Sequence, residues 1–379
     1  MKFAHLLLCS VFTFFVLYGP QPILPELAKS YALSSAQAGL LMTATMLPLA
    51  IAPLLYGVFL MRIAPLKLLQ LSFFLLAVSS ALFPLASSFS ELLILRAVQG
   101  AILPACLTAM TSYIGGAYKY NFLSKAITTY VFSTIAGGFL ARISAAAVNE
   151  YWSWQLYFYT LAGILLLLAI SLQGKKARQR KIPSANSEPL TQHLGNLFSG
   201  RKWQLYCAVF CMFFCFTALL NYLPFILTNE FNFSSKEIGL AYSGYLMGAF
   251  ASLLTPKLQR MTGGRINLLV ACFVLYSFTI ITLLSTWFWL FFVAFTLFCG
   301  AMFVIHANAS AQINSVSKAP PSLTNGMYVS FYYSGGSAGS FLPGLIYTHF
   351  GKAAFLISLL IMCIAGLGLV VGYKKLSNE

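Results

Sequence analysis

The chain has 379 residues, of which 59% are apolar and 8% charged, and its formal net charge is +16. Soluble globular domains carry about 25% charged residues, so this chain has too few to cover a water-exposed surface. The composition therefore excludes an ordinary soluble protein and indicates a protein surrounded mostly by lipid. The positive charges lie in short loops between apolar stretches, a placement typical of membrane topology rather than of nucleic-acid binding.

Twelve apolar segments of about 20 residues follow one another along the chain, each long enough to cross a bilayer core of ~30 Å as an α-helix. The predicted spans are 4–27, 36–60, 67–87, 92–114, 124–147, 154–173, 204–228, 236–258, 267–286, 288–310, 323–348 and 353–373. No small-x-small cleavage site follows the first segment, so we expect a retained span rather than a signal peptide. The predicted fold class is an all-α membrane protein with 12 transmembrane helices.

A polar stretch at 174–203 separates the sixth span from the seventh. It carries five positive charges in the seven positions 175–181, followed by prolines and serines, a composition typical of a linker. We expect a six-helix half on either side of it, at 1–173 and 204–379.

Most lysines and arginines fall in the loops that share a side with the linker and the two termini. Cytoplasmic loops of membrane proteins carry an excess of positive charge. We therefore expect both termini and the basic linker in the cytoplasm, and a multi-pass protein of the cell inner membrane.

The two halves show an internal repeat. Ser-Ser-x-x-x-Gly-Leu at 34–40 returns at 234–240, an offset of 200, and the Tyr-Val and Gly-Gly pairs at 130–138 return at 328–336, an offset of 198. Six spans followed by the same six in parallel is the plan of one architecture of secondary transporters.

Two stretches resemble a known family. Residues 95–100 (Leu-Arg-Ala-Val-Gln-Gly) match the Arg-x-x-Gln-Gly signature of the fourth span in the major facilitator superfamily. Residues 57–62 (Gly-Val-Phe-Leu-Met-Arg) resemble the loop after the family's second span, with Met61 in place of the usual Asp and Ala64 in place of the second Gly. The resemblance covers essentially the whole chain and implies two six-helix halves that rock about a central cavity.

A finer resemblance concerns the fifth span. Residues 134–142 (Thr-Ile-Ala-Gly-Gly-Phe-Leu-Ala-Arg) resemble the Gly-rich fifth span of drug:proton antiporters, without their Gly-Pro pair. Together with 21–25 (Gln-Pro-Ile-Leu-Pro) and 332–337 (Tyr-Tyr-Ser-Gly-Gly-Ser), it looks most similar to the arabinose-efflux-permease-like branch. This resemblance implies efflux of a small organic molecule in exchange for protons, along a path lined by spans 1, 4, 7 and 10.

Arg96 is the first candidate for that path. Burial of an unpaired arginine in lipid costs at least ~2.5 kcal/mol, so its side chain should face the cavity between the halves or a partner. Gln99 follows it at helical spacing. The alternative is an arginine whose side chain extends to the outer interface.

Glu26, at the end of the first span, is the only carboxylate expected at membrane depth. We expect it to pair with Arg96, or with Arg142 in the outer part of the fifth span. Such a pair can bind a proton and a substrate competitively, which is the chemistry of antiport. The alternative is a glutamate solvated in the outer loop.

His306, in the inner part of the tenth span, is a further candidate because histidine titrates near physiological pH. It can equally be a histidine at the polar cytoplasmic end of that span. Gln21 and Asn221 lie at similar depths in the first and seventh spans. They offer hydrogen bonds to a substrate, or bridge the helices.

Small residues in these spans are expected to serve gating and packing, because they let helices approach closely and slide as the halves rock. This set is Gly57, Gly100, Gly137, Gly138, Gly335 and Gly336, and Arg62 in the loop after the second span joins it as a candidate gating residue.

The sequence predicts no cofactor, metal or nucleotide. Cys207, Cys211 and Cys215 recur every four residues without a neighbouring histidine or carboxylate, so we interpret them as packing residues. The Gly-rich stretch at 335–339 lacks the lysine of a phosphate-binding loop.

Together these features predict a secondary active transporter, not an enzyme, that acts as a monomer. Its expected partners are a small-molecule substrate, protons and membrane lipids, and no nucleic acid. One alternative is uptake or exchange of an anionic small molecule, because Arg96, Arg142 and His306 make the membrane interior cationic. An alternative of another class is a non-transporting membrane receptor or scaffold, which the lack of a sizeable soluble domain disfavours.

Overall fold

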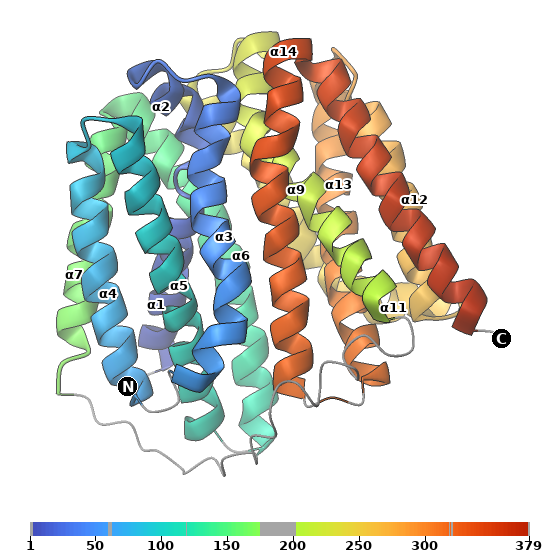
Figure 1. Cartoon of the computed structure of the whole chain (residues 1–379), viewed down its shortest axis with the longest axis horizontal. Helices are drawn as coiled ribbons and strands as arrows, with labels where there is room; N and C mark the ends of the chain where they lie inside the picture. Colours follow the sequence, from blue (N-terminus) through green and yellow to red (C-terminus); the bar gives the residue numbers. More distant parts are fainter. Residues whose placement is uncertain are drawn as a thin grey trace.

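A computed structural model describes residues 3–59, 63–118, 120–174, 202–317, 319 and 321–377. Within these ranges all the regular secondary structure is helical (Figure 1). The basic cluster at 175–181 and Arg62 lie outside the described residues.

The helices before the linker are α1 (Phe3–Tyr18), η1 (Gln21–Ile23), α2 (Leu24–Ser30), α3 (Ser35–Phe59), α4 (Pro65–Leu82), η3 (Phe83–Leu85), α5 (Phe89–Ala117), α6 (Tyr120–Tyr151) and α7 (Trp154–Ser171). Those after it are α9 (Lys202–Phe231), α10 (Ser235–Ala241), η5 (Tyr242–Leu246), α11 (Met247–Met261), α12 (Arg265–Thr282), α13 (Phe288–Val316) and α14 (Pro321–Ser377).

In the described ranges, 11 helical stretches are long and apolar enough to cross a membrane. The last of them, α14, is 57 residues long and bends at Gly351, whose φ of 75° lies outside the helical region. A glycine adopts this left-handed conformation without strain, so the chain reverses there. Two of the twelve predicted spans are thus merged in α14.

Two of the spans are broken rather than continuous. The first consists of α1, η1 and α2, and the break falls at Pro20, which has no N–H to continue the helical hydrogen bonds. In the other, α10, η5 and α11 follow one another, with η5 a 3₁₀ segment.

The repeat is visible in local structure. At the start of α3, the Ser34 hydroxyl accepts a bond from the Gln37 amide while the Gln37 side chain accepts one from the Ser34 amide. Ser234 and Glu237 form the same capping box before α10. The serines of the two sequence repeats therefore begin equivalent helices.

The two sets of helices meet at one end of the bundle, which we call the closed end and which lies away from the termini (Figure 1). There α3 packs along α14, and α6 packs along α10 and η5. Hydrogen bonds cross between Ser35 and Thr348 (2.8 Å) and between Asn149 and Ser235 (3.0 Å).

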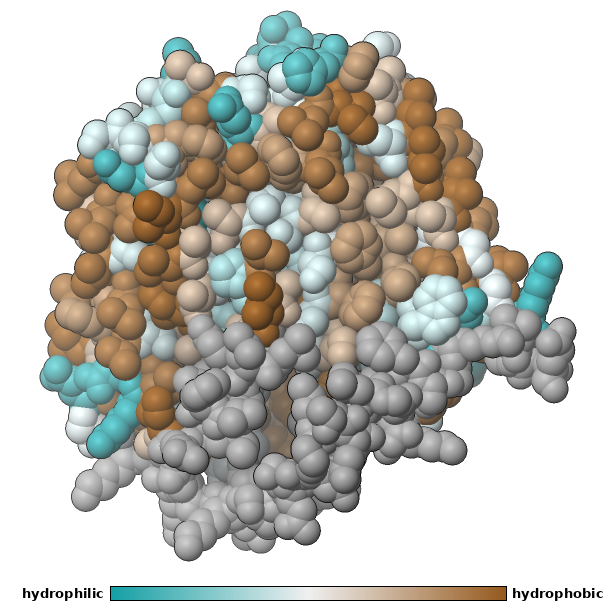
Figure 2. Space-filling model, in the orientation of Figure 1, coloured by the Kyte–Doolittle hydropathy of each residue, from teal (hydrophilic) through white to brown (hydrophobic). Residues whose placement is uncertain are grey.

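The outer surface is apolar around its waist, and hydrophilic residues gather at the upper rim (Figure 2). Large side chains such as those of Phe250, Leu253 and Phe278 are more than 60% exposed. Exposed apolar side chains in this number are stable only against lipid.

Candidate functional site

Arg142, near the closed end of α6, is the centre of a buried polar cluster and is 0% exposed. Its Nε donates to Oε1 of Gln21 (2.6 Å), and its Nη1 donates to the carbonyl of Gly138 (2.6 Å). Its guanidinium carbon also lies 4.3 Å from the ring centre of Tyr18 and 4.7 Å from that of Tyr245. Aromatic faces attract a cation at such distances.

The two broken spans supply these partners. Tyr18 is the last residue of α1 and Gln21 opens η1, while Tyr242 and Tyr245 both belong to η5. A 3₁₀ segment places side chains three residues apart on one face, so both η5 tyrosines reach Arg142.

Gly138 leaves space for the Arg142 guanidinium because it has no side chain. A Cβ at this position would lie 3.3 Å from Nη1 of Arg142 and 3.3 Å from the Tyr245 hydroxyl. The Gly-rich stretch of the fifth span thus has a local role beside Arg142 as well as a packing role.

A chain of amides extends from Arg142 across the two halves. The Gln21 amide donates to Oδ1 of Asn221 on α9, whose amide in turn donates to the Ser340 hydroxyl on α14 (2.8 Å). Gln21 and Asn221, predicted at similar depths in spans 1 and 7, are in direct contact.

The positive charge of Arg142 has no acidic counterpart among the residues that the structure describes. Its hydrogen-bond acceptors are a neutral amide and a carbonyl, and its Nη2 has no hydrogen-bond partner. A buried polar group without a partner is costly, so this donor calls for an explanation.

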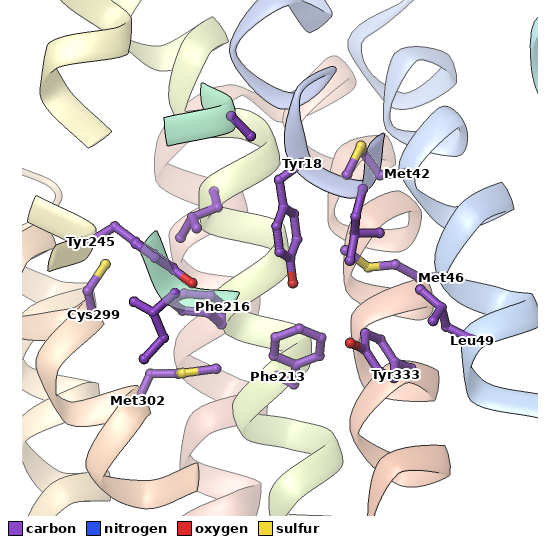
Figure 3. Packing of buried hydrophobic residues seen from close by; sticks show 14 of the residues in the cluster. Tyr18, Met42, Met46, Leu49, Phe213, Phe216, Tyr245, Cys299, Met302 and Tyr333 are labelled. Carbon is purple, nitrogen blue, oxygen red and sulfur yellow. The ribbon is translucent and has the colours of Figure 1, made fainter. Parts of the chain in front are cut away.

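A cavity of about 310 Å³ lies next to this cluster, between the halves and on the side facing the termini. It is lined by α1 and α6 on one side and by α9, η5, α11, α13 and α14 on the other. Its aromatic lining is Phe14, Tyr18, Phe216, Tyr245, Phe303, Tyr328, Tyr332 and Tyr333. Figure 3 shows the hydroxyls of Tyr18, Tyr245 and Tyr333 pointing toward the space around Phe213 and Phe216.

His306 lines the cavity from α13. Its Nδ1 lies 2.7 Å from the Tyr328 hydroxyl, and the Tyr332 ring centre lies 4.9 Å from its own. Of the residues described along the cavity wall, His306 is the one with an imidazole side chain, which can accept or donate a proton.

Arg96 and Gln99 lie elsewhere, inside the first half. Arg96 is 0% exposed and donates to the carbonyls of Val16 (2.8 Å), Leu17 (3.2 Å) and Leu41 (3.2 Å), and to Oε1 of Gln99 (2.7 Å). Pro20 has no N–H, so the Val16 carbonyl is left without its usual helical donor. Arg96 thus caps the broken end of α1 and ties it to α3.

The predicted pairing of Glu26 with an arginine is wrong for this conformation. Glu26 lies half-buried on α2, whereas Arg96 takes carbonyl acceptors and Arg142 takes a glutamine. Carbonyl and amide oxygens at helix breaks replace the carboxylate as acceptors.

The predicted packing glycines sit at close helix contacts. A Cβ at Gly100 would lie 2.3 Å from the Thr45 carbonyl, one at Gly137 2.9 Å from Val11, and one at Gly335 2.3 Å from the Phe210 carbonyl. Gly336 faces the ring of Phe213. Gly57 lies near the end of α3, where only the backbone is described.

The cysteines of α9 are free and pack against neighbouring helices. For instance, the Cys215 thiol donates to the Leu359 carbonyl. Among the described residues, no group of three histidines, cysteines or carboxylates is placed to hold a metal ion.

Sequence reasoning missed the tyrosines of the cluster, namely Tyr18, Tyr242 and Tyr245. The available signal was a pair of tyrosines spaced three apart in the middle of the eighth span. This spacing indicates a shared contact only when the 3₁₀ segment η5 is known, because that segment directs both rings toward α6.

Tyr242 also offers a test of this local architecture. Its hydroxyl donates to the Leu220 carbonyl (2.7 Å), which is free of a helical donor because Pro224 follows four residues later. Replacing Tyr242 with phenylalanine is expected to lower stability by about 1–3 kcal/mol, the cost of an unpartnered buried acceptor. Thermal unfolding of the purified protein in detergent measures this loss.

The matched background is Pro224→Ala, which restores an N–H to bond with Leu220. There, Tyr242→Phe should cost much less, and the two changes should be strongly coupled in a double-mutant cycle. Equal costs in both backgrounds would show that the hydroxyl does not serve the freed carbonyl.

Comparison with known proteins agrees with this architecture. An uncharacterized transporter of Buchnera aphidicola is 24% identical over 369 residues, covering 92% of this chain and 86% of that protein. The inner membrane transport protein YnfM of Escherichia coli is 23% identical over 345 residues, covering 89% and 82%.

A solved structure shares the fold. A bacterial homolog of the human lysosomal transporter Spinster, in an inward-facing and occupied conformation, superposes with a TM-score of 0.79 at 15% identity, covering 99% of this chain and 96% of that one. The sequence profile of the Major Facilitator Superfamily matches residues 6–324. With most of its length matched by that profile, and with its broken helices meeting at a central cavity, the chain belongs to the major facilitator superfamily.

Proposed function

We propose that this protein exports a small organic solute across the inner membrane in exchange for protons, as do the drug:proton antiporters that it resembles. The observation that carries the proposal is the aromatic cavity between the halves, sealed on one side by contacts among α3, α6, α10 and α14. A solute held there is exposed alternately to each side when the halves rock.

The positive-inside rule supports the orientation. Lys374 and Lys375 lie in the last turn of α14, away from the closed end. In this reading the cavity faces the cytoplasm, and the halves at 1–173 and 204–379 rock about it as a monomer in the lipid bilayer.

His306 is the proposed proton-coupling group. It lines the cavity and contacts the Tyr328 hydroxyl, so a change in its charge alters the cavity wall directly. Glu26 lies half-buried outside the cavity lining and is the competing candidate.

The test uses purified protein in proteoliposomes with a pH-sensitive dye inside and a panel of neutral, anionic and cationic aromatic solutes outside. We expect at least one solute to drive proton movement in the wild type. In His306→Gln, solute-driven proton movement should disappear while exchange of labelled for unlabelled solute continues.

Glu26→Gln serves as the control and should retain proton movement. Loss of proton movement in Glu26→Gln, with His306→Gln unaffected, would transfer the coupling role to the carboxylate. A wild-type protein that moves no solute of any class would instead favour a receptor or scaffold.

A further inference from the structure

The two buried arginines of this protein have very different surroundings. Both are 0% exposed. Every nitrogen of the Arg96 guanidinium donates to a carbonyl, an amide oxygen or a sulfur. Arg142 instead keeps one nitrogen, Nη2, without an acceptor. Arg96 shows how this fold satisfies an arginine that serves only the structure, and Arg142 departs from that pattern.

The charge of Arg142 is also incompletely balanced. Its neighbours are the neutral amide of Gln21, the Gly138 carbonyl and the rings of three tyrosines. Rings and neutral acceptors stabilise a cation, but they leave its full positive charge in a region of low dielectric constant. An anion placed beside the guanidinium would be strongly stabilised by this charge.

The cavity and Arg142 share two side chains. Tyr18 and Tyr245 line the cavity and also present their ring faces to the guanidinium. Both residues belong to broken spans, one at the last residue of α1 and one in η5. These two rings therefore link the cavity to the guanidinium.

The chemistry of the cavity wall indicates which uncharged body a ligand would carry beside its anionic group. It is built mainly from aromatic rings, with the hydroxyls of Thr134, Ser252 and several tyrosines among them. No carboxylate, lysine or arginine is found among its described lining residues. Such a wall suits an apolar or aromatic body, and it holds no carboxylate that would pair with a cationic solute.

We propose that Arg142 is the anion-recognition residue of the cavity, and that the solute carried is an organic anion, a carboxylate or sulfonate on an aromatic or apolar body. The anion would accept a hydrogen bond from Nη2, with the Tyr18 or Tyr245 ring displaced. This rests on the proposed function, because it names the substrate class of the same cavity.

The test is equilibrium binding to the full-length protein in lipid nanodiscs. The probes are benzoate, benzenesulfonate and hexanoate, with benzamide and benzylamine as neutral and cationic counterparts of benzoate. At least one anion is expected to bind saturably in calorimetry and to raise the melting temperature, whereas benzamide and benzylamine bind at least about tenfold more weakly, as the loss of a charge-assisted hydrogen bond implies.

Arg142→Gln should weaken anion binding by about tenfold or more, and Arg142→Lys should retain part of it. Arg96→Lys is the matched control, because it alters an equally buried arginine that is not itself among the residues lining the cavity, and it should leave anion binding unchanged. If Arg142→Gln does not fold, the anion proposal is tested by whether the wild type prefers benzoate to benzamide.

Binding of none of the three anions, equal binding of benzamide, or unchanged binding in Arg142→Gln would each overturn the proposal. The assay requires no transport, so its outcome is separable from that of the proposed function. Anion binding without solute movement in proteoliposomes would contradict the transport proposal and leave the anion proposal standing. Transport of neutral solutes that Arg142→Gln leaves unchanged would contradict the anion proposal and leave the transport proposal standing.

Discussion

Replacing Arg96 with alanine is expected to destabilise the protein severely, so that little folded material is recovered from membranes. The change leaves the carbonyls of Val16 and Leu17 without the donor that Arg96 supplies, at roughly 1–3 kcal/mol for each buried acceptor. The Leu41 carbonyl keeps the Thr45 hydroxyl as a donor. The change also empties the volume that the side chain fills between α1, α3 and α5. Yield, size-exclusion profile and apparent melting temperature in detergent measure the effect.

Arg96→Lys is the informative companion. Lysine keeps the charge but lacks the planar fork that reaches several acceptors at once, so an intermediate melting temperature is expected. If Arg96→Ala instead melts like the wild type and fails only in transport, the arginine belongs to the substrate path, as the sequence predicted.

Replacing Gly335 with alanine is the second change with a large expected effect. Its Cβ would lie 2.3 Å from the Phe210 carbonyl, a backbone atom that moves only if α9 and α14 separate. We expect a loss of about 1–3 kcal/mol, typical of an overpacked contact, seen as a lower melting temperature.

Gly163→Ala is the matched control. Gly163 lies on α7 with no atom within 4 Å of its ideal Cβ position. The same substitution there should be neutral or stabilising by up to about 1 kcal/mol, because alanine favours the helix. Opposite signs at the two sites support close packing of α9 on α14, whereas equal effects would mean that helix propensity alone is being measured.

Several features were predictable from single residues and short patterns. Hydropathy located the spans, because any helix in lipid needs a long apolar run whatever its neighbours are. Pro20 explains the break in the first span for an equally local reason, because it has no N–H to continue the helix. The Arg-x-x-Gln-Gly match led to the family, which the profile over residues 6–324 confirms.

The partners of the buried charges were not predictable in this way. A sequence shows that Arg96, Arg142 and Glu26 lie in or near apolar spans, but not how each helix is rotated about its axis. The carbonyls that accept hydrogen bonds from Arg96 cannot be identified from residue types, because every residue has a carbonyl. The prediction therefore favoured Glu26, the only carboxylate in view, and was wrong for this conformation.

The sequence by itself thus determined the number of spans, the internal repeat, the apolar exterior and the presence of two charged residues inside the membrane. Only the tertiary structure decided what those charges do. Arg96 closes a broken helix end, whereas Arg142 lies beside an aromatic cavity with one donor unused. The reason is physical: membrane insertion depends on the summed hydrophobicity of a segment, whereas the role of a buried charge depends on the few atoms within hydrogen-bonding distance, which come from helices distant in sequence.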